Sequence, residues 1–173
     1  MDRSSARILD PIPLDPASLY IILNDIGDQV EFHWALYLAK SPTEKTGTGN
    51  LYHATNRLGV SKFIFQEKVD SNLNSSVNFL VAVKIGDIEP YLWDSLGNML
   101  HPPDQHPDGK MPIDDSTNCR SWVVKALELL DDYGYIKLKG ESITKIQDQC
   151  RRAAADNWTS RERTVEKSGY SFA

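Results

Sequence analysis

A cysteine at the start of a predicted helix and a histidine in an apolar strand are the residues of this chain best suited to chemistry. Cys119 opens a strongly amphipathic pattern, and His33 lies in the apolar run of residues 30–38. The unpaired N–H groups and positive dipole at a helix N-terminus favour the thiolate, which is the nucleophilic form of cysteine. An imidazole on a rigid strand can accept the thiol proton and then pair with the thiolate. The two residues together predict a thiol-nucleophile enzyme.

The spacing of apolar residues in this helix directs the thiol toward the strands. The helix is predicted over residues 117–133, with Ser116 as its N-cap and Gly134 just beyond its C-terminal end. One stripe at i, i+4, i+7 and i+11 contains Cys119, Val123, Ala126 and Leu130. Because this stripe must pack on the sheet, Cys119 is expected to face the strands that carry His33.

Each candidate also has a purely structural interpretation. Most free cysteines are small buried hydrophobes, and a histidine such as His33 is often a hydrogen-bonded core residue. Cys150, in the middle of a second predicted helix, has no histidine nearby in the sequence and is interpreted as structural. A possible metal cluster contains His101, Asp104, His106 and Asp108. The prolines between them favour a solvated loop, so no metal or other cofactor is expected.

The rest of the pattern is that of a single α+β domain. Short apolar runs predict five strands, at residues 19–23, 30–38, 51–55, 60–65 and 77–85. Turn-sized connections between them indicate an antiparallel meander. Helices are expected at residues 88–100, 117–133 and 142–156. We therefore expect an antiparallel sheet packed by helices over residues 19–158, between a Pro-rich arm (1–18) and a polar tail (159–173).

Composition narrows the classes of partner. The chain has 173 residues, of which 40% are apolar and 25% charged, as in an ordinary globular domain. Its net charge of −5 argues against nucleic acid, because phosphate binding requires a basic face. No apolar run is long enough to span a bilayer, and the first residues lack the apolar core of a signal peptide. Two cysteines are too few for a disulfide scaffold, so a cytoplasmic location is expected.

Three short motifs resemble those of a known group of enzymes. Residues 33–38, His-Trp-Ala-Leu-Tyr-Leu, resemble the His-Trp-Ala-x-Tyr segment of the lecithin:retinol acyltransferase-like and small phospholipase/acyltransferase families. Residues 118–123 resemble their Asn-Cys-x-x-aromatic-Val motif, and residues 52–54 occupy the place of their second histidine. These families belong to the circularly permuted NlpC-type branch of the papain-like fold, in which the histidine strand precedes the cysteine helix. The resemblance covers residues 19 to about 130 and also fits families of small fungal proteins.

The resemblance assigns a role to each motif residue. It implies that Cys119 is the nucleophile, that His33 is the base and that His53 orients His33. Neighbouring motif residues are the candidates to line the substrate site, namely Trp34, Tyr52, Asn118 and Trp122. The polar C-terminal residues differ from the apolar, membrane-anchoring tail of the lipid acyltransferases. A small-molecule or carrier-bound acyl substrate is therefore expected, without a stable membrane anchor.

The expected reaction is acyl transfer. The thiolate would attack an ester, thioester or amide carbonyl, and water or a small acceptor would then remove the acyl group, as in a hydrolase or an acyltransferase. The acidic loop at residues 101–115 is expected to border the pocket and to favour a neutral or cationic substrate over an anionic one. Two alternatives remain open. One is a peptidase or isopeptidase of the same fold, as a similarity to permuted PPPDE-type peptidases implies, and the other is a binding module that has lost activity.

Overall fold

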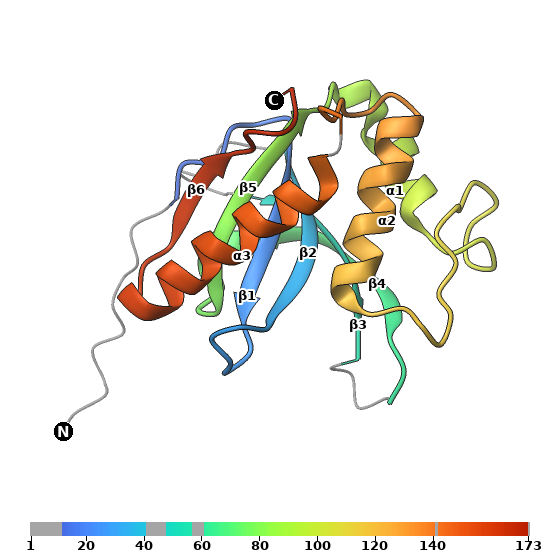
Figure 1. Ribbon diagram of the computed structural model, residues 1–173. Helices are drawn as coiled ribbons and strands as arrows, with labels where there is room; N and C mark the ends of the chain where they lie inside the picture. The colour runs from blue at the N-terminus through green and yellow to red at the C-terminus, as the bar shows by residue number, and fades with distance from the viewer. Residues whose placement is uncertain (1–11, 41–47, 57–60, 141, 173) are drawn as a thin grey trace.

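The apolar runs form the strands of one mixed sheet, which confirms the predicted α+β class. The computed structural model describes residues 12–40, 48–56, 61–140 and 142–172 (Figure 1). Its strands are β1 (Ser18–Asp25), β2 (Phe32–Ala39), β3 (Thr48–Thr55), β4 (Ile64–Asn72), β5 (Phe79–Asp87) and β6 (Thr164–Lys167). Its α-helices are α1 (Trp93–Leu100), α2 (Cys119–Asp132) and α3 (Ser142–Ser160). Among the described residues, no helix is long and apolar enough to cross a membrane.

The strand order is only partly the predicted meander. The sheet has the order β4-β3-β2-β1-β5-β6, so β1 to β4 follow one another while β5 returns to the far side of β1. β5 is buried along its length except at Asp87, which suits an interior strand, whereas most of β4 is partly or fully exposed, as in an edge strand. The prediction of a polar tail was wrong for residues 164–167, because they form β6 and pair in parallel with β5.

The two faces of the sheet are covered by different parts of the chain. Figure 1 shows α2 and α3 lying across the same face, and buried residues of α1 belong to the same core cluster. The opposite face packs against Ile12 and Leu14, from the segment that was predicted to be part of a Pro-rich arm. A 3.0 Å ion pair between the buried Lys84 and Asp15 also holds this segment to the sheet.

Helix α2 begins at the candidate nucleophile and not before it. The N-cap is Asn118, whose side-chain oxygen accepts a 2.9 Å hydrogen bond from the backbone N–H of Ser121. In return, the Ser121 hydroxyl accepts a 2.9 Å bond from the Asn118 N–H, which completes a capping box. The predicted cap, Ser116, was wrong because its N–H and hydroxyl bind Asp114 in the preceding turn. Gly134 follows the helix at φ +79°, as predicted for a C′ glycine.

The first helix is shorter than predicted. Residues 88–100 contain a 3-10 turn at Pro90–Leu92, and the α-helix begins only at Trp93. Pro90 has no N–H to donate and stands at the start of the 3-10 turn, where none is needed. Three of the four buried residues of α1, Leu96, Met99 and Leu100, add to the core under the sheet.

Candidate active site

The strands that carry His33 and His53 separate at the end of the sheet where these residues lie. The ladder between β2 and β3 ends at the pair Leu36–Tyr52. Beyond this pair β2 remains paired with β1, and β3 remains paired with β4. Side chains, in place of backbone hydrogen bonds, therefore connect the two strands at this end.

The two histidines bridge the separated strands. His33 Nε2 lies 2.6 Å from His53 Nδ1, and the rings meet edge to face with their centroids 4.9 Å apart. Both residues are buried, with 7% and 5% of their surface exposed. The contact that the resemblance implied between His33 and His53 is thus present in the structure. Burial on both sides restrains the two rings to one mutual orientation.

Gln66 adds a third member that the sequence analysis missed. It stands directly opposite His53 in the β3–β4 ladder, and its Oε1 lies 2.7 Å from His53 Nε2. The signal that would have found it is the register of β3 against β4. That register depends on a connection whose length and shape no sequence pattern specified, and the predicted strand at 60–65 stopped one residue short of Gln66.

This chain of contacts fixes where the protons lie when both rings are neutral. An amide oxygen only accepts, so the hydrogen of His53 must be on Nε2, and His53 Nδ1 must then accept. His33 Nε2 is consequently the donor to His53, which leaves the lone pair of the His33 ring on Nδ1. In this arrangement Nδ1 is the nitrogen of the His33 ring that can accept a proton.

Removing the Gln66 oxygen should weaken the preference for this arrangement of protons on the two histidine rings. In Gln66→Leu, His53 loses the partner that holds its proton on Nε2, so we expect Cys119 alkylation to slow by about tenfold, the value of roughly one hydrogen bond. The rate is measured with iodoacetamide at neutral pH, and the ring tautomers are read from histidine nitrogen chemical shifts. Lys68→Leu, an exposed position on the same strand, is the matched control. An unchanged rate in Gln66→Leu would show that Gln66 does not act on Cys119 through His53 and His33.

Cys119 lies where the N-terminus of α2 meets the start of β2. Its Sγ is 3.8 Å from the backbone oxygen of Phe32, the residue just before His33. The predicted stripe is confirmed, since Val123, Ala126 and Leu130 are all buried in the helix-side core. Cys119 itself is half-buried at the end of this stripe. The thiol is therefore held at the edge of the core and remains accessible from outside.

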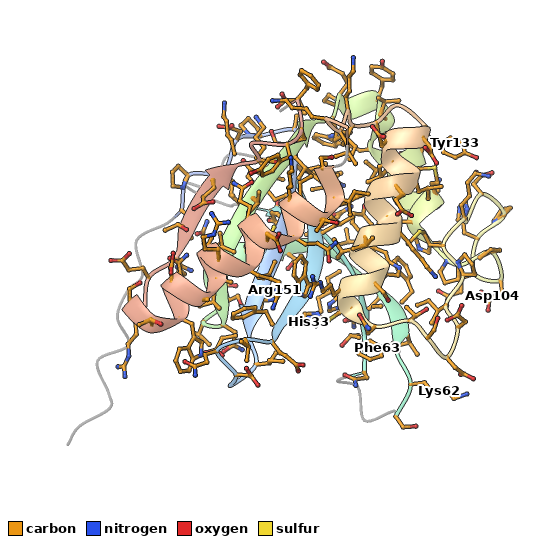
Figure 2. The ribbon with its side chains drawn as sticks, in the orientation of Figure 1. His33, Lys62, Phe63, Asp104, Tyr133 and Arg151 are labelled. Atoms are coloured by element: carbon orange, nitrogen blue, oxygen red, sulfur yellow. The ribbon has the colours of Figure 1, made fainter. Side chains whose placement is uncertain are left out.

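His33 and Cys119 line the same cavity, which has a volume of about 660 Å³. The cavity is formed by the β1–β2 connection, the start of β2, the two ends of the β3–β4 connection, the N-terminus of α2 and one residue of α3. Figure 2 shows three of its side chains, His33, Phe63 and Arg151, gathered around the end of α2 where the helix begins. Its size lies within the range of small-molecule sites. The arrangement joins a thiol, a positioned imidazole and space for a ligand.

Two of the four predicted substrate-binding residues line this cavity, and two do not. Trp34 and Asn118 line it. Tyr52 precedes His53 in the strand, so its side chain points to the opposite face of the sheet, and it is only 1% exposed. This burial raises the pKa of Tyr52 to about 12. Trp122 is also 1% exposed, since it lies one helical turn deeper than Cys119 and packs against Phe65. Tyr52 and Trp122 are core residues, so their predicted role is corrected.

Several cavity residues were not found from the sequence. Arg120 of α2 is one of them, and its Nε donates a 2.6 Å hydrogen bond to Gln147 of α3. Its guanidinium carbon also lies 5.4 Å from the centre of the Trp34 ring. Arg151 of α3 and Phe63 before β4 complete this side of the cavity. No local pattern pointed to these residues, because the packing of α3 beside α2 brings them to the site.

The remaining candidates do not form a second centre. Cys150 is fully buried in α3, and this burial raises the pKa of its thiol, which agrees with its structural interpretation. His101 Nε2 lies 3.2 Å from a carboxylate oxygen of Glu67. Within the part of the chain that the structure describes, no three His, Cys, Asp or Glu side chains are grouped to hold a metal ion.

The acidic loop before α2 lies beside the cavity and not in it. Asp114 and Asp115 line a neighbouring hollow of about 310 Å³. This hollow shares Phe63 and Asn118 with the larger cavity. The end of the loop therefore borders the site from one side, while the charges around the thiol come from other elements.

Comparison with known families gives one match. Residues 19–137 match DUF6540, described as a family of unknown function, and this span is more than half of the chain. The chain belongs to the DUF6540 family. The matched span contains His33, His53 and Cys119, whereas α3 with Arg151 lies beyond it. Comparisons with curated proteins and with solved structures found no match.

Proposed function

We propose that this DUF6540 protein is a thiol-nucleophile enzyme that forms an acyl-enzyme at Cys119 and passes the acyl group to water or a small acceptor. The observation that carries the proposal is that His33 and Cys119 line one cavity, while His53 and Gln66 hold the His33 ring. A histidine oriented by a third group next to a cysteine at a helix N-terminus is the arrangement that activates a thiol. A cysteine outside any disulfide also suits a reducing compartment such as the cytoplasm.

The proposed reaction has two balanced halves. His33 Nδ1 takes the Cys119 proton, and the thiolate attacks the carbonyl carbon of an ester, thioester or amide. The tetrahedral intermediate collapses, the bond to the leaving group breaks, and the proton on His33 passes to that group. In the second half His33 takes a proton from water or an acceptor, which attacks the acyl-enzyme. The Cys119 thiolate leaves and recovers a proton from His33.

The start of α2 supplies the stabilisation that this intermediate needs. The N–H of Ser121 is occupied by the capping box, and the N–H of Trp122 donates to the Asn118 carbonyl. We therefore assign the oxyanion to the backbone N–H groups of Cys119 and Arg120, the first two residues of the helix. Donors of this kind, aimed at the developing oxyanion, contribute about 3–4 kcal/mol each to lowering the barrier.

Two features support a permuted papain-like identity and a small substrate. The histidine strand precedes the cysteine helix, and β2 parts from β3 where His33 lies. His33 and the N-terminal residues of α2 line one cavity. The cavity volume of about 660 Å³ suits a small or carrier-bound acyl group better than a folded protein substrate. Cleavage of a peptide or isopeptide bond is the outcome that would favour a peptidase of the same fold.

The test is a turnover assay on a panel of acyl esters, thioesters and peptides. The wild type should turn over at least one acyl compound, and Cys119→Ala should lose at least about 1000-fold of that rate, because no other group supplies the nucleophile. Cys150→Ser is the matched control and should retain the wild-type rate. Full activity in Cys119→Ala would refute the proposal, and no turnover of any acyl compound by the wild type would favour a binding module.

A further inference from the structure

We propose that the acyl donor carries an anionic group, a carboxylate or a phosphate, that binds between Arg120 and Arg151 beside Cys119. This inference rests on the proposed function, because it names the class of substrate for the same site. The two arginines come from different helices, α2 and α3, and both line the cavity with the thiol. Both are half-buried, so they belong to the wall of the cavity and not to the open surface.

The positive charge of this wall is offset only in part by nearby carboxylates. Among the described residues, neither Arg120 nor Arg151 forms an ion pair with a carboxylate. Among the described residues that line the cavity, Glu31 is the acidic one, and it is exposed. A guanidinium that lacks a carboxylate partner and faces a cavity is suited to bind carboxylate or phosphate with two parallel hydrogen bonds.

Arg120 is held in position for such a ligand. Its Nε donates to Gln147, and its guanidinium carbon lies over the Trp34 ring. The terminal amino groups are therefore the part of the guanidinium that can bind a ligand. Burial lowers the pKa of Arg120, and the positive charge of Arg151 lowers it further, partly offset by Asp148. The two cations therefore repel each other across the cavity. An anion between them would remove this repulsion and would itself be stabilised by both.

This substrate class is opposite to the one that the acidic loop suggested. Asp114 and Asp115 line the neighbouring hollow, whereas Arg120 and Arg151 line the cavity that contains Cys119. Electrostatic interactions decay with distance and with screening by salt, so the charges in the cavity wall outweigh those of an exposed loop.

The first experiment compares two reagents that differ in charge. Iodoacetate and iodoacetamide form the same bond with a thiolate, but only iodoacetate carries a carboxylate, so their rate ratio at Cys119 isolates the effect of the positive wall. We expect Arg151→Gln to lower this ratio by about fivefold, as for removal of one unit charge about 4 Å away in water. Arg152→Gln, at the exposed neighbouring position of α3, is the matched control and should leave the ratio unchanged.

The ratio separates the two proposals. A Cys119 that reacts rapidly with both reagents, but with the same ratio in wild type and Arg151→Gln, would overturn the anionic substrate and leave the enzyme proposal standing. A lower ratio in Arg151→Gln alone supports the inference. An equal fall in Arg152→Gln would reveal a general surface effect and would also overturn it.

A second experiment needs no reactive thiol. In Cys119→Ala, the indole N–H resonance of Trp34 should shift saturably on titration with acetate or with inorganic phosphate, and not with acetamide. The anion that binds more tightly in this titration indicates which group the acyl donor carries. The response should be lost in the Arg151→Gln background and kept with Arg152→Gln. No saturable shift would overturn the anion site, whereas a shift combined with an inert thiol in the wild type would retain the site and overturn the proposed enzyme.

Discussion

Replacing His33 by alanine should slow alkylation of Cys119 by iodoacetamide at neutral pH by about 100-fold or more. In the proposed mechanism His33 accepts the thiol proton and then stabilises the thiolate as a cation, so the variant removes both effects, while the helix N-terminus remains. Timed quenching followed by peptide mass spectrometry gives the rates at Cys119 and Cys150 in the same sample. Cys150 should stay unlabelled in every folded variant, because its thiol is fully buried and its pKa is raised.

The controls separate activation from access. His106→Ala removes a histidine from the loop at residues 101–115 and should leave the rate at Cys119 unchanged, since His106 does not line the cavity. Labelling of Cys150 in His33→Ala would mean that the variant has unfolded. Equal rates at Cys119 in folded wild type and folded His33→Ala would show that Cys119 is an ordinary accessible thiol.

Replacing Trp122 by alanine should lower the free energy of unfolding by about 3–5 kcal/mol. The side chain is among the largest that are fully buried, and it packs against Phe65 between α2 and the sheet. Denaturant titration measures the loss. Tyr133→Ala, an aromatic residue at the exposed C-terminal end of the same helix, is the control and should cost less than about 1 kcal/mol.

This prediction also tests the corrected role of Trp122. Trp122→Phe should retain most of the stability, and it should leave the KM for any substrate unchanged, because the indole does not line the cavity. An unchanged stability in Trp122→Ala together with a raised KM would restore the original prediction that this residue binds substrate.

Period-two and period-3.6 patterns predicted the parts of the site that are fixed locally. Alternation in the run at residues 30–38 correctly placed Trp34, Leu36 and Leu38 on one face of the sheet. The helical stripe correctly placed Cys119 on the side of α2 that packs on the sheet, at its N-terminal end. These patterns depend only on backbone geometry and the burial of one face, so a single sequence is enough to reveal them. The motif resemblance then led to the His33–His53 pair, which local periodicity alone would not have joined.

The missed parts depend on how distant elements pack. Gln66 reaches His53 only through the β3–β4 register, and Arg151 reaches the cavity only because α3 packs beside α2. The position of β5 beside β1, and the addition of β6, follow from burial of the whole sheet and not from any pattern within those segments. Tyr52 and Trp122 were assigned to the site because they neighbour functional residues in the sequence, whereas strand alternation and helix depth turn their side chains into the core.

The most direct test of the central claim is to trap the acyl-enzyme. The wild type is mixed with an activated ester such as p-nitrophenyl acetate at neutral pH and quenched in acid during the first turnover. Intact-mass and peptide analysis then locate the acyl group. We expect one acetyl group on Cys119, greatly reduced in His33→Ala, absent in Cys119→Ala and unaffected in Cys150→Ser. Acetylation that is equal in wild type and His33→Ala, or that is confined to lysines, would contradict it.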